Sequence, residues 1–242
     1  MRKKTGTGRT VVVSALKAES QTLQQHSDTL DLYTSGMGSA AVDKCLSELA
    51  TQKISGLISW GVCGALTPKL KSGDLLIPKS VMNQSRRTIE CDDSWRKTIL
   101  DALPGSALDT CFSDCHFTDS DLIEATPVSK RTLADISGAD AVDMESFTIA
   151  DFANQHKIPF VIIRAVVDTI DDTLPSASAF NPGQSSVSFN TLFNAIIRPQ
   201  QWPALIRTGG QFNAALASLK TLADGSINTL CLSDNQITPN HD

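Results

Sequence analysis

The chain has 242 residues, of which 41% are apolar and 19% are charged, and its formal net charge is −5. This balance is typical of a soluble globular protein and gives no electrostatic case for a nucleic-acid partner. No apolar stretch approaches the roughly 20 residues of a membrane-spanning helix, and residues 1–10 lack an apolar signal core. We therefore expect a cytoplasmic protein whose six cysteines are free thiols.

Short apolar runs alternate with amphipathic segments along the chain. The apolar runs predict strands at residues 11–13, 31–34, 56–59, 74–77 and 160–165. The amphipathic segments predict helices at residues 40–50, 95–100, 127–136, 145–156, 185–197 and 203–222, the last interrupted at Gly209 and Gly210. No repeat or linker divides this pattern, so we expect one domain over residues 11–224, with a flexible tail at 1–10 and a loose polar tail at 225–242.

Acidic residues stand at two boundaries between predicted elements. Residues 141–146 read Ala-Val-Asp-Met-Glu-Ser, and an apolar run ends at Asp168. The end of a buried strand is where an α/β sheet places its chemistry, and two acids from different elements suit a reaction that needs one protonated and one ionised. The alternative is structural: Asp143 and Glu145 cap one helix, and Asp168 caps the next. The spacing alone leaves both interpretations open.

Two glycine-containing segments follow predicted strands and are expected to form turns. Gly36 and Gly38 fit the start of a dinucleotide-binding pattern, but the acid required about 20 residues later is missing, because residues 56–58 are Gly, Leu and Ile. A turn that holds a nucleoside or a phosphate at a helix N-terminus stays open as an interpretation. The residues expected to form these two turns are Gly36, Gly38, Gly61, Val62 and Cys63. We expect no metal and no organic cofactor.

Four segments in register resemble the nucleoside phosphorylase and nucleosidase superfamily. They are Val-Ser-Ala-Leu-Lys-Ala-Glu at 13–19, Ser-Gly-Met-Gly at 35–38, Ile-Ser-Trp-Gly-Val-Cys-Gly-Ala-Leu at 58–66 with Leu-Lys-Ser-Gly-Asp-Leu-Leu-Ile-Pro at 70–78, and Val-Asp-Met-Glu-Ser at 142–146 with Arg-Ala-Val-Val-Asp at 164–168. The sequences of these segments are most similar to those of the hopanoid-biosynthesis-associated nucleosidase/phosphorylase group, which is associated with removing adenine from adenosylhopane. The resemblance implies a three-layer α/β/α sandwich around a mixed, partly barrel-like sheet.

The resemblance also implies roles for individual residues. Asp168 matches the general acid that protonates N7 of the purine, and its apolar neighbours offer desolvation as the means of raising its pKa. Glu19 matches the acid that activates water in the hydrolytic branch. Met144 and Glu145 match the residues that pack under the ribose and bind its hydroxyls. The purine-contacting loop of the family falls at Leu122 and Ile123.

Three departures from the family pattern bear on the reaction. Val167 stands where many relatives have a serine, and Ser59 and Val62 stand where bacterial hexameric phosphorylases have an arginine and a serine for phosphate. A phosphate dianion without an arginine fork loses its strongest contacts, whereas water activated by Glu19 needs none of them. We therefore expect hydrolysis. Phosphorolysis, with phosphate as co-substrate and charge from Lys17, Arg86 or a partner subunit, stays open.

A third possibility is a non-catalytic nucleoside-binding module. The combination of Glu19, Glu145 and Asp168 argues against it, since a binder has no use for a proton donor and a water base. The expected partners are a small nucleoside, with a lipid-linked one as candidate, and further copies of the chain in a homodimer or higher homo-oligomer. The apolar residues of segment 202–219 are expected to form core or a subunit contact, with transient membrane contact as the alternative.

Overall fold

The computed structural model describes residues 8–121, 123–174 and 202–232, and in these ranges the side chains of all but residues 106 and 202–208. The strands are β1 (Arg9–Ser14), β2 (Asp31–Thr34), β3 (Ile54–Ala65), β4 (Leu75–Leu76), β5 (Ser80–Met82), β6 (Thr88–Glu90), β7 (Cys111–Phe112), β8 (His116–Asp119), β9 (Ala141–Asp143) and β10 (Phe160–Asp168). The helices are α1 (Lys17–Gln21), α2 (Ser39–Leu49), α3 (Asp93–Asp101), α4 (Gly105–Leu108), α5 (Pro127–Ser137), α6 (Ser146–His156) and α8 (Trp202–Leu230), with a 3₁₀ turn at Gln24–His26.

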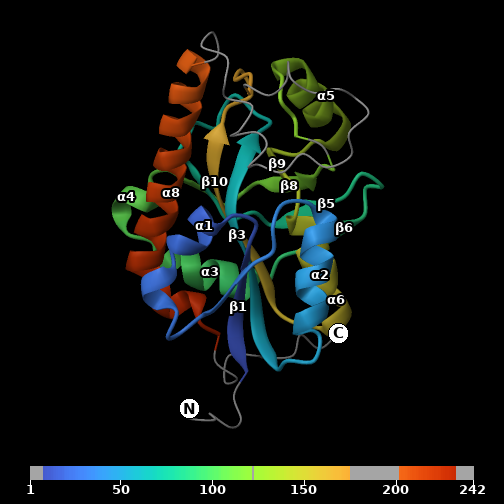
Figure 1. Cartoon of the computed structure of the whole chain (residues 1–242), viewed down its shortest axis with the longest axis vertical. Helices are drawn as coiled ribbons and strands as arrows, with labels where there is room; N and C mark the ends of the chain where they lie inside the picture. Colours follow the sequence, from blue (N-terminus) through green and yellow to red (C-terminus); the bar gives the residue numbers. More distant parts are fainter. Residues whose placement is uncertain (1–7, 122, 175–201, 233–242) are drawn as a thin grey trace.

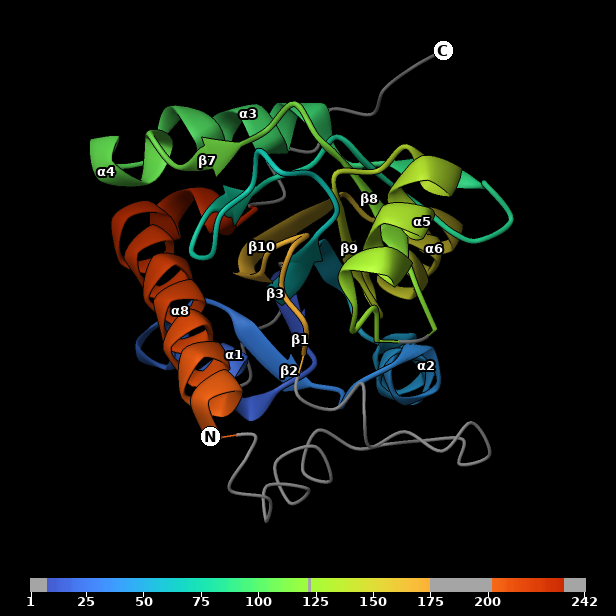
Figure 2. The same cartoon turned by 90° about the horizontal axis from the view of Figure 1, so that it is seen from above.

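These strands form one mixed sheet between two layers of helices, as predicted (Figure 1). The order along the sheet is β6-β5-β8-β9-β3-β10-β4-β7, and β1 extends it from β3 toward β2. Within the described ranges the path has open ends, so the sheet is not closed; the expected barrel-like character does not extend to closure. Seen from above, α8 lies on one side of β3 and β10, and α2 and α6 lie on the other (Figure 2).

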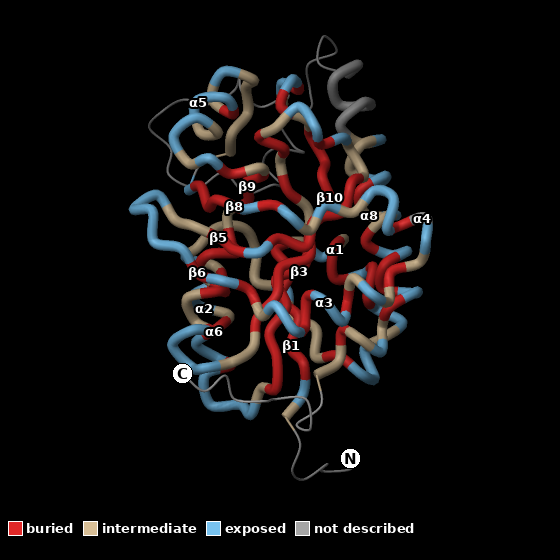
Figure 3. The backbone as a smooth tube through the Cα atoms, turned by 180° about the vertical axis from the view of Figure 1, so that it is seen from behind, coloured by how far each residue is buried: buried red, intermediate tan, exposed pale blue. Residues whose placement is uncertain are grey.

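The strand alternation explains this layering. Successive side chains of a strand point to opposite faces of the sheet. In β10, Phe160 and Ile162 join the apolar cluster that contains residues of α2 and α6, whereas Val161 and Ile163 join the cluster that contains residues of α3 and α8. Because both faces are covered, the middle of the sheet is buried throughout (Figure 3) and the central strands are near-continuous apolar runs.

The carboxyl ends of four parallel strands meet at one edge of the sheet. β1 pairs in parallel with β2 and β3, and β3 pairs in parallel with β10. The segments that leave these ends carry Glu19 after β1 and Gly38 after β2, and β10 itself ends at Asp168. This edge therefore gathers the candidate residues that the sequence places far apart, as the general rule for open α/β sheets predicts.

Three expectations about local structure are wrong. Residues 61–64 form no turn, because β3 continues through them to Ala65. Gly209 and Gly210 do not interrupt α8, whose only non-helical residue is Ser226. The expected tail boundary at residue 225 falls inside this helix, and the backbone of Leu232 hydrogen-bonds to Thr10 and Ser55.

Four other expectations have mixed outcomes. The strand β1 begins at Arg9, inside the expected N-terminal tail. The helix expected at 185–197 lies outside the described residues. All six cysteines are free thiols, as expected. In the ranges that the structure describes, no helix is long and apolar enough to cross a membrane.

Candidate active site at the carboxyl edge of the sheet

A buried guanidinium, that of Arg164 in β10, lies at the centre of the site. Its Nε lies 2.9 Å from Oδ2 of Asp143, and its Nη2 lies 3.9 Å from Oε2 of Glu145. Nη2 also donates hydrogen bonds to the hydroxyls of Ser59 (2.8 Å) and Ser146 (3.2 Å). Nη1 is buried and has no hydrogen-bond partner among the described residues. An unpaired buried donor is costly, so Nη1 is suited to hold a polar ligand or a water.

Glu19 approaches the same guanidinium from the segment after β1. Its Oε2 accepts a hydrogen bond from the backbone N–H of Leu16 (2.8 Å), and its Oε1 accepts one from Val62 (2.9 Å). Gly61 makes this approach possible, because a Cβ at that position would collide with both Nη1 of Arg164 and Oε1 of Glu19. The glycine thus leaves room for a carboxylate and a guanidinium side by side over β3.

Glu145 and Asp143 have different structural roles, although only one residue separates them. Oδ1 of Asp143 accepts a hydrogen bond from the backbone N–H of Ser146 (3.0 Å) at the start of α6, so the expected helix cap is present there. Glu145 makes no such cap. Its Oε1 instead accepts a hydrogen bond from the backbone N–H of Gly38 (2.9 Å), where a φ of 83° favours glycine. Met144, between the two acids, is half-buried.

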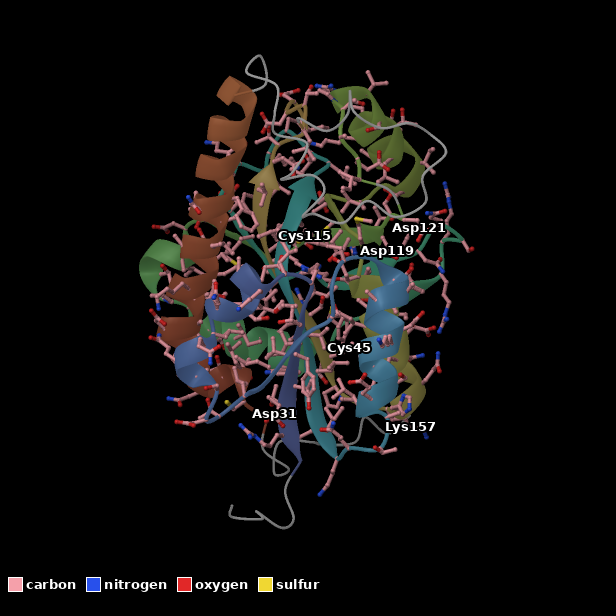
Figure 4. All side chains as sticks on the ribbon, in the orientation of Figure 1. Asp31, Cys45, Cys115, Asp119, Asp121 and Lys157 are labelled. Atoms are coloured by element: carbon pink, nitrogen blue, oxygen red, sulfur yellow. The ribbon has the colours of Figure 1, made fainter. Side chains whose placement is uncertain are left out.

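Carboxylates outnumber cations in this part of the site. Burial raises the pKa of Glu145 to about 7 against the opposing effect of Arg164, and burial also raises the pKa of Glu19. Asp119 lies in register with Asp143 on the neighbouring strand β8, and its Oδ1 is buried without a partner in the described part of the chain. Burial, together with Asp143 and Glu145, raises the pKa of Asp119 to about 8. Figure 4 shows Asp119 and Asp121 in the region between α5 and α2.

Asp168 is positioned by an irregularity at the end of β10. The register with β3 shifts between Val166 and Asp168, so that Asp168 pairs with Gly64. A β-bulge of this kind re-aims a side chain at the end of a strand. A Cβ on Gly64 would lie 3.2 Å from Oδ2 of Asp168, so the missing side chain leaves space for the carboxylate. Gly61 and Gly64 therefore leave space for the carboxylates of Glu19 and Asp168, respectively.

A buried lysine contacts this carboxylate. Lys130, in the first turns of α5, is 0% exposed, and its Nζ forms an ion pair with Oδ2 of Asp168. Nζ also donates hydrogen bonds to the backbone oxygens of Thr169 (2.6 Å) and Asp172 (3.2 Å). Burial raises the pKa of Asp168, whereas Lys130 lowers it, and the balance is a raised pKa. The segment after Asp168 forms no described helix, so the expected cap at this residue is absent.

The remaining residues predicted from the sequence contribute to the site in different ways or not at all. Ile123 is half-buried between β8 and α5, and Leu122 lies outside the described residues. Val62 contributes its backbone N–H to Glu19 rather than part of a turn. Cys63 is buried, and burial raises the pKa of its thiol well above the usual range, which fits a packing residue better than a nucleophile.

Two of the candidate phosphate-binding cations lie outside the cluster around Arg164. Lys17 is exposed at the start of α1. Arg86 donates a hydrogen bond to the backbone oxygen of Ile136 (2.7 Å) and is exposed. Arg164 and Lys130, by contrast, were assigned no role from the sequence. A signal existed for Arg164, since a charged residue inside a fully buried strand must have partners; Lys130 has no comparable signal, because lysine is common on amphipathic helices.

Comparison with known proteins fits this geometry. Residues 3–196 match the family described as the Phosphorylase superfamily. The chain belongs to this superfamily. A 5′-methylthioadenosine/S-adenosylhomocysteine nucleosidase of Buchnera aphidicola subsp. Schizaphis graminum is 26% identical over 157 residues, which cover 59% of this chain and 67% of the relative. The superfamily fold accounts for the mixed sheet and its two helical layers.

Three solved structures share the fold. A Helicobacter pylori methylthioadenosine nucleosidase mutant with 5′-methylthioadenosine in its active site has a TM-score of 0.70 and 12% identity, covering 92% of this chain and 99% of its own. A futalosine hydrolase of the same organism has a TM-score of 0.63 and 15% identity, covering 90% and 97%. A Colwellia psychrerythraea nucleosidase with adenine has a TM-score of 0.69 and 14% identity, covering 93% and 97%.

Proposed function

We propose that this protein is a nucleosidase that hydrolyses the N-glycosidic bond of a 5′-substituted adenine nucleoside. Its relatives are nucleosidases, and the chain is an enzyme that cleaves N-glycosidic bonds. The choice of water as the acceptor rests on one observation: the carboxylate of Glu19 and Nη1 of Arg164 converge above Gly61, and this Nη1 has no hydrogen-bond partner among the described residues. A water there would have a base for its proton and a donor to orient it.

The proposed reaction divides the work between the two ends of the site. Asp168 donates a proton to N7 of the purine while the C1′–N9 bond breaks, and the bonding electrons leave with the base. Glu145 binds the ribose hydroxyls, and its negative charge favours the oxocarbenium-like sugar. Water then attacks C1′ and gives its proton to Glu19. Proton exchange with solvent returns both acids to their starting states.

The charge distribution disfavours phosphate as the acceptor. A phosphate dianion beside Arg164 would also meet Asp143, Glu145 and Glu19, which already surround this guanidinium. Repulsion from these carboxylates would offset much of the attraction to one arginine. Neutral water meets no such repulsion. This argument supports hydrolysis, and phosphorolysis remains the competing proposal.

The test is the release of free adenine from adenosine, 5′-methylthioadenosine and adenosylhopane, each with and without phosphate. We expect release without phosphate and a free sugar as the second product. The Asp168→Asn variant is the matched negative control for contaminating nucleosidases. An obligate phosphate requirement with a sugar 1-phosphate product would replace hydrolysis by phosphorolysis. Tight nucleoside binding without any release would favour a binding module.

We further propose that the 5′ substituent is a lipid, and this proposal rests on the resemblance to the hopanoid-associated group. Among the described side chains of α8, Ala215 and Leu219 are buried against the sheet, while Phe212 and Leu216 are partly buried beside them. Core packing is thus the role of this part of the helix. The substrate comparison decides the matter: preference for adenosylhopane over 5′-methylthioadenosine supports the lipid-linked nucleoside, and the reverse preference favours a small 5′ substituent.

A further inference from the structure

The ammonium group of Lys130 is fully buried, and it has no role in the proposed reaction as described above. It lies on α5, whereas its three acceptors lie at the end of β10 and in the segment that follows. An ammonium group has three N–H donors, and here each has an acceptor: Oδ2 of Asp168 and the backbone oxygens of Thr169 and Asp172. The geometry of Nζ is therefore fully determined, which is unusual for a flexible lysine side chain.

The ion pair with Lys130 restricts the orientation of Asp168, the proposed general acid. Lys130 engages Oδ2 of Asp168, which leaves Oδ1 as the oxygen to present to the purine. The bulge opposite Gly64 sets the backbone position from which this carboxylate projects. A general acid contributes to the rate only when it is held in reach of the atom that it protonates. The lysine and the bulge together restrict the carboxylate to one orientation.

The ion pair also acts against the protonated state that the reaction requires. An adjacent cation favours the carboxylate, whereas burial favours the carboxylic acid. When two groups interact this strongly, the proton belongs to the pair rather than to one residue. Other titratable groups near Asp168 are the Cys63 thiol of β3, which senses its charge, and Asp172, whose Oδ2 is held by Thr169 and Gln211 of α8.

We propose that Lys130 is a positioning residue of the active site, which orients the carboxyl group of Asp168 and sets the pH above which this acid loses its proton. The inference rests on the proposed function, since it concerns the same general acid. Base release should decline at high pH as Asp168 ionises. Lys130 moves this decline to lower pH than burial alone would give, because the ammonium stabilises the carboxylate.

The experiment measures kcat and KM between pH 5 and 10 for the full-length wild type, Lys130→Met and Lys130→Arg. In Lys130→Met the alkaline decline moves to higher pH, so that activity at pH 9, relative to each enzyme's own maximum, is about tenfold higher than in the wild type. Its maximal kcat falls because the carboxylate is no longer oriented, while KM changes little. Lys130→Arg keeps the cation and therefore keeps the position of the decline.

The control is Lys79→Met, which removes another lysine that pairs with an aspartate, Asp114, but at an exposed position outside the site. Its pH profile should match that of the wild type. Because Lys130→Met leaves a buried carboxylate without its cation, its folding is checked by circular dichroism. If it does not fold, the double variant Lys130→Met/Asp168→Asn should fold, because it removes both charges. The kinetic test then uses Lys130→Arg. An alkaline decline of activity that moves in this variant contradicts the proposal.

A second measurement separates failure of this inference from failure of the proposed function. The carboxyl carbon of Asp168, assigned with Asp168→Asn, is titrated by NMR without substrate. A titration that moves to higher pH in Lys130→Met supports the pairing even if no nucleoside is cleaved, in which case only the proposed function fails. An active Lys130→Met enzyme with an unchanged alkaline decline and an unchanged titration overturns the inference.

Discussion

The two acidic parts of the site differ in how their carboxylates meet positive charge. Around Arg164, the acids Glu19, Asp143 and Glu145 share one guanidinium, whereas in the described part of the chain Asp168 is the one acid that pairs with Lys130. Carboxyl groups therefore outnumber cations where the sugar is proposed to bind, whereas one carboxyl group is balanced by one cation where the base is proposed to leave. The difference matches the demands of the reaction, since the sugar becomes cationic in the transition state and the leaving base needs a proton.

The first prediction removes the acid on the balanced side. Asp168→Asn cannot donate a proton to N7, so kcat for an adenine nucleoside should fall by about 10²–10⁴-fold. Nucleoside binding, measured by calorimetry, should survive. A variant that retains more than about a tenth of the wild-type kcat would show that this residue is not the general acid.

The second prediction removes the base on the acidic side. Glu19→Gln should lower kcat for hydrolysis by at least about 10²-fold, because the amide cannot accept the proton of water. In a phosphorylase the nucleophile arrives as an anion, so phosphate-dependent turnover should mostly persist. Rates with and without phosphate therefore separate the two reactions, and persistence with phosphate contradicts hydrolysis.

The third prediction compares the two glycines that accommodate these acids. Gly61→Ala forces both Arg164 and Glu19 to move, and a displacement of about 1 Å can lower a rate about 10²-fold. Gly64→Ala places a Cβ 3.2 Å from Oδ2 of Asp168, a milder contact, so the loss of kcat should be smaller, about tenfold. Steady-state kinetics of both variants test the order. Equal and negligible losses would contradict the view that these strand glycines make room for the acids.

The fourth prediction concerns stability at alkaline pH. Burial raises the pKa of Asp119 to about 8, so the folded protein binds more protons than the unfolded chain between the ordinary aspartate pKa and about 8. Stability contributed by this group is therefore lost as the pH rises through that range. Asp119→Asn removes the loss, and its Tm should exceed that of the wild type by about 5 °C at pH 9 and by much less at pH 4.

Differential scanning calorimetry of the wild type and Asp119→Asn at several pH values measures this Tm difference. Asp121→Asn is the matched control, since Asp121 is exposed two residues further along the chain. A Tm gain for Asp119→Asn that is independent of pH would indicate a packing effect rather than a titration effect.

Much of the fold could be predicted from the sequence because its signals are local. The apolar run at 160–165 and the helical periodicity at 40–50 each reflect burial of one segment against the rest of the protein, and the structure confirms both. The short strands β5 to β9 have two to four residues each, too few to show a period, and they were missed. The turn expected at residues 61–64 was wrong because glycine also occurs in strands where another group approaches closely.

The sequence by itself determined the order of the main elements, the superfamily resemblance and three candidate acids, Glu19, Glu145 and Asp168. Only the tertiary structure decided which cation each acid meets. That pairing depends on the register of β10 with β3, on the bulge before Asp168, and on the position of α5, which brings Lys130 to an acid 38 residues further along the chain. Register and helix placement arise from packing across the whole sheet, and no local pattern encodes the distance between two residues that meet only when the chain has folded.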